Sequence, residues 1–300
     1  MFEKLKISVA VKAIRRDWKI SDAKRDEGLT TPEDIQRYDG ISYGPHGEEN
    51  TLDIYVQKTV TEKQPTIVNV HGGGWVYGST VQYQYYCMSL AQRGFTVVNI
   101  NYRLAPETKF PGAVEDINQV MTFIAEQGEK YNIAKARLVM VGDSAGGQLV
   151  SHYATIWSNP AFAKLFDFKV PDVKIKAVGL NCGTYDGRSM CDSGTDGFFV
   201  EYLGYVGKKV PEEIKEKVDA MKYMTSDFPP AFVMSAVNDF LVTGVEPMYQ
   251  FLTNLGVPCK MHIYGSKERT EVAHVFHVNI RLEEATQCND DECEFFRQFV

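Results

Sequence analysis

From Thr66 onward, short runs of β-branched and other apolar residues alternate with longer amphipathic stretches. This alternation is typical of parallel strands joined by crossover helices. Because the short runs are apolar at nearly every position, we expect the strands to be buried on both faces. The predicted strands cover residues 66–70, 96–101, 138–141, 175–180, 231–236 and 260–264, and residues 52–56 predict an antiparallel strand that precedes them.

Helical patterns fill the intervals between these strands. They cover residues 82–92, 113–127, 145–157, 247–255 and 283–299. Two segments break the alternation. Residues 1–37 are charged and mostly helical in pattern, and residues 184–230 are far longer than the roughly 2–6 residues of an ordinary connection between helix and strand. We expect both segments to form a cap over one single α/β domain that spans residues 1–300.

Composition narrows the choice of partners and location. The chain has 300 residues and a net charge of -7, and no basic stripe that could bind nucleic acid. The longest apolar run of the first 20 residues is interrupted by Ser8, so we expect neither a secretory signal nor a membrane span. Six cysteines at irregular spacings form no CxxC pair, which favours reduced thiols in a cytoplasmic protein without a metal site.

The strongest chemical signal is the turn Gly142-Asp143-Ser144-Ala145-Gly146-Gly147, which lies between a predicted buried strand and a predicted helix. Glycines there let the strand and helix backbones pass closely while Ser144 is held in a strained conformation with its hydroxyl exposed. The start of the helix stabilises negative charge beside that hydroxyl. Ser144 is therefore the predicted nucleophile, and the turn and its setting together predict a serine hydrolase.

A second turn, His71-Gly72-Gly73-Gly74-Trp75, directly follows the strand predicted over residues 66–70. Ester hydrolysis passes through a tetrahedral oxyanion, which needs backbone N–H groups free of side-chain obstruction. We expect Gly73 and Gly74 to donate, together with the N–H of Ala145. A nucleotide-binding loop is disfavoured, because no Lys-Ser/Thr pair follows and the chain has no G-x-G-x-x-G.

A serine nucleophile needs a base, and in an α/β-hydrolase the chain order is serine, acid, histidine. His152 lies within the nucleophile's predicted helix and His262 within a predicted strand, which leaves His274 and His277. We favour His274 and keep His277 as the alternative. For the acid we favour Asp239, just after the strand predicted over 231–236, over Asp186, which opens the long cap segment. Asp143 is too close to Ser144 in the chain to reach the histidine and is predicted to have a structural role.

Together these motifs resemble the hormone-sensitive-lipase-like family (family IV) of carboxylesterases in the α/β-hydrolase superfamily. The matching segments run in family order from about Thr66 to Phe276 and are His71-Gly72-Gly73-Gly74-Trp75, Tyr102-Arg103-Leu104-Ala105-Pro106-Glu107, Gly142-Asp143-Ser144-Ala145-Gly146-Gly147, Asp239-Phe240-Leu241 and His274-Val275-Phe276. The resemblance implies a mostly parallel sheet flanked by helices, a helical cap from the N-terminus and a later insertion, and a Ser144-Asp239-His274 triad. One departure is Val275, where glycine often follows the histidine in this family.

The predicted function is a serine carboxylesterase that hydrolyses short to medium acyl esters through an acyl-enzyme on Ser144, with a small-molecule ester as its partner and no metal or cofactor. Three alternatives stay open: an esterase that removes acetyl or hydroxycinnamoyl groups from sugars, an amidase or peptidase with the same triad, and an inactive ligand-binding member of the fold. Aromatic residues of the later cap segment could line an acyl pocket or simply pack on the body, namely Phe198, Phe199, Tyr202 and Tyr205.

Overall fold

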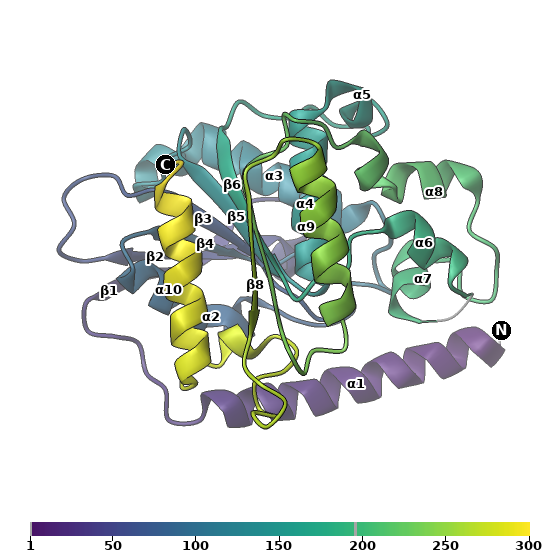
Figure 1. Ribbon diagram of the computed structural model, residues 1–300, viewed down its shortest axis with the longest axis horizontal. Coiled ribbons are helices and arrows are strands. Elements are labelled where there is room, and N and C mark those ends of the chain that lie inside the picture. The colour runs from purple at the N-terminus through teal and green to yellow at the C-terminus, as the bar shows by residue number, and fades with distance from the viewer. Residues whose placement is uncertain (1, 195–196) are drawn as a thin grey trace.

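A single mixed sheet forms the centre of the molecule (Figure 1). The computed structural model describes residues 2–194 and 197–300, and side chains from residue 9 onward. In this part of the chain eight strands lie in the order β1-β2-β4-β3-β5-β6-β7-β8. The strands β1 and β2 pair antiparallel, β2 pairs antiparallel with β4, and the remaining pairs are parallel. Their bounds are β1 Ile35–Ser42, β2 Thr51–Gln57, β3 Thr66–Val70, β4 Thr96–Ile100, β5 Leu138–Asp143, β6 Ile175–Asn181, β7 Ala231–Ala236 and β8 Cys259–Tyr264.

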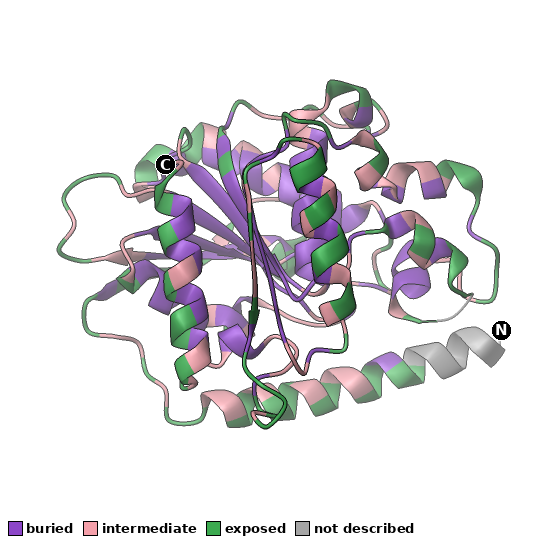
Figure 2. Ribbon diagram, in the orientation of Figure 1, coloured by how far each residue is buried: buried purple, intermediate pink, exposed green. Residues whose placement is uncertain are grey.

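Helices cover both faces of this sheet. Side chains of α3 (Gly112–Gln127), α4 (Ala145–Ser158) and α9 (Val245–Asn254) belong to one apolar core, and those of α2 (Thr80–Gln92) and α10 (Glu283–Arg297) to a second core on the opposite face. The strands β3, β4 and β5 are buried at every position, as their continuous apolar runs predict. Figure 2 shows this burial along the central strands and on the inward sides of the helices. The predicted α/β-hydrolase architecture is confirmed.

The N-terminal segment is mostly helical, as predicted, but the prediction missed a strand. α1 (Phe2–Asp26) ends before Gly28, and β1 begins at Ile35. Gly28 has a φ of 78°, a conformation that favours glycine, and Pro32 follows, so the helix cannot continue. The strand escaped prediction because it lies at the edge of the sheet and most of its side chains are exposed or half-buried, which leaves no apolar alternation.

The described residues of the long segment between β6 and β7 form three short α-helices, α6 (Gly187–Asp192), α7 (Phe198–Leu203) and α8 (Glu212–Val218), and a 3-10 helix at Ala220–Tyr223. The α-helices gather on one side of the body, and the N-terminal part of α1 runs past the same side (Figure 1). α7 packs onto the body through Phe199 and Tyr202, which are both buried. In the described residues no helix is both long and apolar enough to cross a membrane.

Candidate active site

The turn after β5 holds Ser144 in an unusual backbone conformation. Its φ is 52° and its ψ is -120°, and its N–H donates to the carbonyl of Asn181 on the neighbouring strand β6 at 2.8 Å. A Cβ on Gly146 would overlap the carbonyl of Val70, and one on Gly142 would overlap the carbonyl of Gly146. Only glycines permit this close passage of β3, β5 and α4. The sequence therefore presents the Ser144 hydroxyl at the carboxyl end of the sheet and at the N-terminus of α4.

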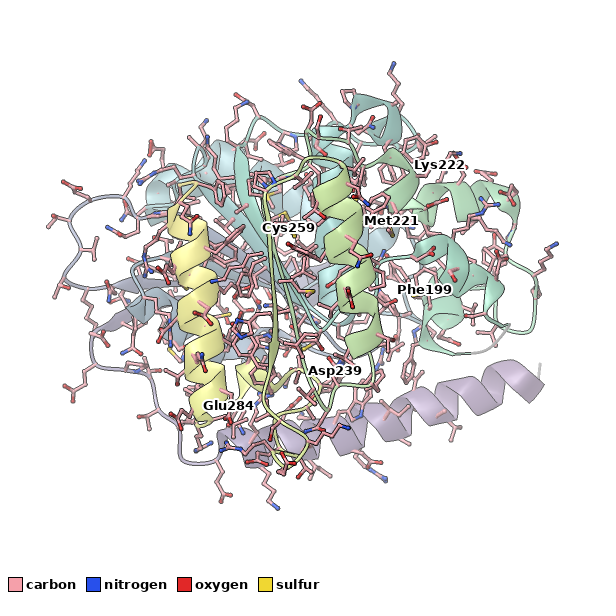
Figure 3. All side chains as sticks on the ribbon, in the orientation of Figure 1. Phe199, Met221, Lys222, Asp239, Cys259 and Glu284 are labelled. Carbon is pink, nitrogen blue, oxygen red and sulfur yellow. The ribbon has the colours of Figure 1, made fainter. Side chains whose placement is uncertain are left out.

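Two loops bring a histidine and a carboxylate to this hydroxyl. Nε2 of His274 lies 3.0 Å from Oγ of Ser144, and Nδ1 of His274 lies 2.8 Å from Oδ1 of Asp239. Asp239 follows β7, and its carboxylate also accepts hydrogen bonds from the Ser235 hydroxyl at 2.6 Å and from the Leu241 N–H at 2.8 Å. Figure 3 labels Asp239 at the end of the central strands nearest to α1. The structure thus brings Ser144, His274 and Asp239 into one hydrogen-bonded chain.

Electrostatics determines which atoms donate hydrogen bonds and which accept them between Ser144, His274 and Asp239. Burial alone would raise the pKa of Asp239, but the hydrogen bonds from His274 and Ser235 and the charge of His274 lower it below its usual value. An ionised carboxylate can only accept, so Nδ1 of His274 carries the hydrogen and Nε2 presents its lone pair to Ser144. This is the tautomer that a general base needs.

The triglycine turn after β3 lies beside Ser144 with free backbone donors. Gly73 and Gly74 have φ values of 115° and 59°, and within the described residues their N–H groups have no hydrogen-bond acceptor. A Cβ on Gly73 would overlap the carbonyl of Tyr77. Ala145 is the first residue of α4, so its N–H has no earlier helical turn to pair with.

Buried polar contacts brace this turn. The hydroxyl of Tyr83 accepts the N–H of Gly72 at 3.0 Å and donates to Asp143 at 2.7 Å. Burial raises the pKa of Asp143 to about 7. The ring of His71 stacks on Tyr102 with centroids 4.2 Å apart, and the Tyr102 hydroxyl donates to the His71 carbonyl at 2.9 Å. Asp143 therefore has the structural role expected from its position.

Aromatic side chains from three segments line the outer side of the triglycine turn. The Phe198 ring lies 3.1 Å from the position that a Cβ on Gly74 would take. Phe198 is edge-on to Trp18 of α1, and Trp18 is edge-on to Tyr77, with centroids 5.8 and 5.6 Å apart. Arg15 of α1 donates to the carbonyls of Val76 and Ala105 at 2.6 and 2.8 Å and pairs with Glu107. Both proposed cap segments thus reach the turn.

The remaining candidates lie elsewhere. His277 is fully buried, edge-on to Tyr86 with centroids 5.2 Å apart, and burial lowers its pKa to about 3. His152 stacks on Phe110, and His262 stacks on Tyr264. Asp186, the alternative acid, caps α6 by accepting the Ser189 N–H at 2.8 Å. The structure therefore joins none of these four residues to Ser144 in its described hydrogen bonds.

One group of potential metal ligands overlaps the site. In the described part of the chain, Sγ of Cys182 and ligand atoms of Asp239 and His274 lie within 4.8 Å of one another. Burial and then the Asp239 carboxylate raise the pKa of the Cys182 thiol, which disfavours the thiolate that binds metals. The His274 and Asp239 atoms are hydrogen-bonded to each other. This donor set suits proton transfer better than a metal centre.

Sequence reasoning missed three residues near the site. Trp18 reaches it from α1, and its only signal was a lone tryptophan in a charged helix. Phe240 lies against His274 with ring centroids 4.4 Å apart, and its signal was its place directly after the predicted acid. Glu292 of α10 accepts from Asn181, whose carbonyl in turn holds the N–H of Ser144. Glu292 had no sequence signal, because it lies in an otherwise ordinary amphipathic helix.

Comparison with known proteins places this geometry in a family. The model of the BD-FAE family matches residues 52–247, which include the triglycine turn, Ser144 and Asp239. A curated relative from Mycobacterium tuberculosis (strain ATCC 25618 / H37Rv), a probable carboxylic ester hydrolase called LipM, is 29% identical over 213 residues. That alignment covers 68% of this chain and 49% of the relative, so the chain spans about half of that relative's length.

Solved esterase structures share the fold along nearly the whole chain. Esterase B from Lactobacillus rhamnosis, solved with a C4-C4 SN3 tributyrin phosphonate inhibitor, has a TM-score of 0.88 at 22% identity and covers 98% of this chain and 95% of its own. An esterase from Pyrobaculum calidifontis has a TM-score of 0.71 at 23% identity and covers 96% and 93%. The predicted relationship to the hormone-sensitive-lipase-like α/β-hydrolases is confirmed.

Proposed function

The chain belongs to the BD-FAE family, and from that premise we propose that it is a serine carboxylesterase acting on small-molecule esters through an acyl-enzyme on Ser144. The observation that supports this most directly is the hydrogen-bonded chain from Ser144 through His274 to Asp239. The similarity to proteins named as ester hydrolases agrees with it.

In the acylation step, Nε2 of His274 removes the Ser144 proton as Oγ bonds to the ester carbonyl carbon, and the carbonyl electron pair moves onto its oxygen. Gly73, Gly74 and Ala145 donate their N–H groups to this oxyanion. When the carbonyl re-forms, the bond to the alcohol oxygen breaks, and His274 returns the proton to that oxygen. The alcohol leaves, and the acyl group stays on Ser144.

Deacylation repeats these steps with water. His274 takes a proton from the water as its oxygen bonds to the acyl carbon, and the same N–H groups receive the second oxyanion. Collapse releases the acid, and the proton on His274 returns to Ser144. Asp239 holds the imidazole in the required tautomer and stabilises its cation, without taking the proton itself.

The cap and the acyl range are part of the proposal. We infer that α1 and residues 184–230 form a cap, because Trp18 and Phe198 meet beside Gly74. Aromatic rings so close to the proposed oxyanion donors would limit the length of an acyl chain on that side. Short to medium acyl chains fit this description, and the butyryl-type inhibitor of esterase B points the same way for that relative.

The test is the hydrolysis of p-nitrophenyl butyrate by the purified chain and by Ser144→Ala. We expect kcat to fall by roughly 10⁶-fold, the loss found for a triad serine in a protease. Ser21→Ala, an exposed serine on α1, serves as the matched control and should keep the wild-type rate. An unchanged rate in Ser144→Ala would sink the assignment.

A second measurement separates the proposal from the open alternatives. A fluorophosphonate should label Ser144 in the wild type, and absence of labelling would favour an inactive binding protein. Matched p-nitroanilides should react much more slowly than the esters. Comparable rates for the two would favour an amidase with the same triad. Sugar acetates and hydroxycinnamates complete the panel and report on the sugar-ester alternative.

A further inference from the structure

Phe240 is the most exposed large apolar side chain in the described residues. Its exposed fraction is 74%, and its ring centroid lies 4.4 Å from that of the His274 imidazole, with the planes inclined by 48°. A single exposed phenylalanine on a surface needs no explanation. One that lies against the proposed general base does, because the leaving group of a substrate must also come close to that histidine.

The loop that carries Phe240 is well ordered by hydrogen bonds. The Asp239 N–H donates to the Ala236 carbonyl at 3.0 Å, and the Val242 N–H donates to the Asp239 carbonyl at 3.2 Å. The Leu241 N–H donates to the Asp239 carboxylate at 2.8 Å. Phe240 therefore lies between two anchored residues, and its exposed ring is held beside His274 by the same bonds that fix the catalytic acid.

The proposed reaction fixes which half of an ester meets this ring. The alcohol oxygen must come within about 3.2 Å of Nε2 of His274 to receive its proton. The carbonyl oxygen points instead at the N–H groups of Gly73 and Gly74. The carbon atoms attached to the alcohol oxygen thus lie on the His274 side, within reach of Phe240, and the acyl chain lies toward the opposite side.

The side chains around Phe240 and His274 favour an apolar alcohol. Leu241 and Val275, the neighbours of Phe240 and His274 in the chain, are both apolar and half-buried. Both nitrogens of His274 are already hydrogen-bonded, and the Asp239 carboxylate accepts three hydrogen bonds. A sugar would need hydrogen-bonding partners for several hydroxyls, whereas an aromatic or aliphatic group needs only the ring face.

Building on the proposed esterase activity, we propose that Phe240 forms the alcohol subsite of this protein and that the subsite selects esters of aromatic or other apolar alcohols. The ring packs against the leaving alcohol in the Michaelis complex and acts through binding, so its contribution falls mainly on KM. An aromatic contact of this kind changes kcat/KM by about two- to ten-fold, and the covered apolar area adds to that.

The experiment compares benzyl butyrate with ethyl butyrate, which share the acyl chain and differ in the alcohol. Hydrolysis by the full chain is followed by base titration. We expect Phe240→Ala to lower kcat/KM for benzyl butyrate by about ten-fold, chiefly through KM, and to change that for ethyl butyrate by less than about two-fold. Phe240→Tyr should retain the wild-type ratio. Val81→Ala, at a 59% exposed apolar residue of α2, is the matched control and should leave the ratio unchanged.

Two results would overturn the subsite. An equal loss for both esters in Phe240→Ala would mean that the ring only positions His274. A wild-type preference for a butyrylated methyl glucoside over benzyl butyrate, lost in Phe240→Ala, would assign the ring to sugars. Neither result would touch the esterase proposal, because ester hydrolysis and labelling of Ser144 would persist. Failure of the wild type to hydrolyse any of the three esters would instead count against the proposed function itself.

Discussion

The two sides of Ser144 are built differently. On the side of the triglycine turn, Gly74 lies under Phe198, and Phe198 lies against Trp18. On the other side, His274 lies beside Phe240, whose ring is 74% exposed. We call the first side, where half-buried rings from distant segments cover part of the turn, the enclosed side, and the second, with its exposed ring, the open side. Under the proposed function, the acyl group would lie on the enclosed side and the alcohol on the open side.

Among changes that touch one side of Ser144 and leave the serine in place, the largest expected effect comes from the open side. Asp239→Asn removes the negative charge that holds His274 in its tautomer, and the amide can present its N–H₂ to Nδ1 in place of an acceptor. We expect kcat to fall by about 10⁴-fold, as it does for the same change in a serine protease triad. Steady-state kinetics on p-nitrophenyl butyrate measures this. A loss below ten-fold would indicate that another carboxylate orients the histidine.

The next effect tests the enclosed side. Gly74→Ala places a Cβ at 3.1 Å from the Phe198 ring in a backbone with a φ of 59°, which should displace an oxyanion donor and lower kcat by about 10²- to 10³-fold. Gly256→Ala is the control, because Gly256 has a φ of 78° with nothing near its Cβ position and lies in a turn before β8. Equal losses in both variants would mean that backbone strain alone is responsible.

Low pH should lower the stability of the folded protein through two buried histidines, His71 and His277. Burial lowers the pKa of His71 to about 4 and that of His277 to about 3, below the roughly 6.5 of an unfolded chain. The unfolded state therefore binds protons that the folded state does not, so stability is full above about pH 6.5 and is lost as the pH falls. At pH 5, protonation of His277 in the unfolded state lowers the free energy of unfolding by about 2 kcal/mol, and His277→Phe should remove this loss.

Thermal unfolding at pH 7 and pH 5 checks this prediction. The drop in Tm between the two pH values should be several degrees smaller in His277→Phe than in the wild type. The comparison uses the change with pH within each protein, so a general loss of packing in the variant cancels. An identical drop in both proteins would show that His277 does not titrate on unfolding.

The smallest effect belongs to the ion pair that links α1 to the enclosed side. The Arg15 guanidinium lowers the pKa of Glu107, but the Glu107 side chain is 58% exposed. Solvent screens such a pair, so Glu107→Gln should cost less than about 1 kcal/mol. Its Tm at low and high salt should differ little from that of the wild type. A large loss would mean that α1 depends on this pair more than on Trp18.

Sequence patterns predicted the elements on which the site is built. The continuous apolar runs of β3, β5 and β7 fixed the parallel strands, since only strands buried on both faces need them. The glycines around Ser144 and after His71 predicted both turns, because close backbone passage leaves no other choice. The choice of His274 over His277 rested on position alone, and the distances to Ser144 and Asp239 now support it.

Other features depend on contacts that no local pattern encodes. β1 is an edge strand with mostly exposed side chains, so its sequence looks like a loop. Cys182 and Glu292 reach the site only because β6 and α10 pack next to it. The meeting of Trp18 with Phe198 joins segments 180 residues apart, and only the folded chain brings them together. Such long-range contacts shape the surroundings of Ser144, and no local sequence pattern encodes them.

The exposed ring of Phe240 has a consequence for how this protein can change over generations. A side chain that is 74% exposed contributes little to the folded core, so its replacement is tolerated at small cost in stability. On the proposed role of Phe240, mutations at this position would alter the preferred alcohol in a single step. New acyl preferences would require coordinated changes in α1 and α7, where Trp18 and Phe198 pack together. Evolution, natural or in the laboratory, should therefore diversify the leaving group first.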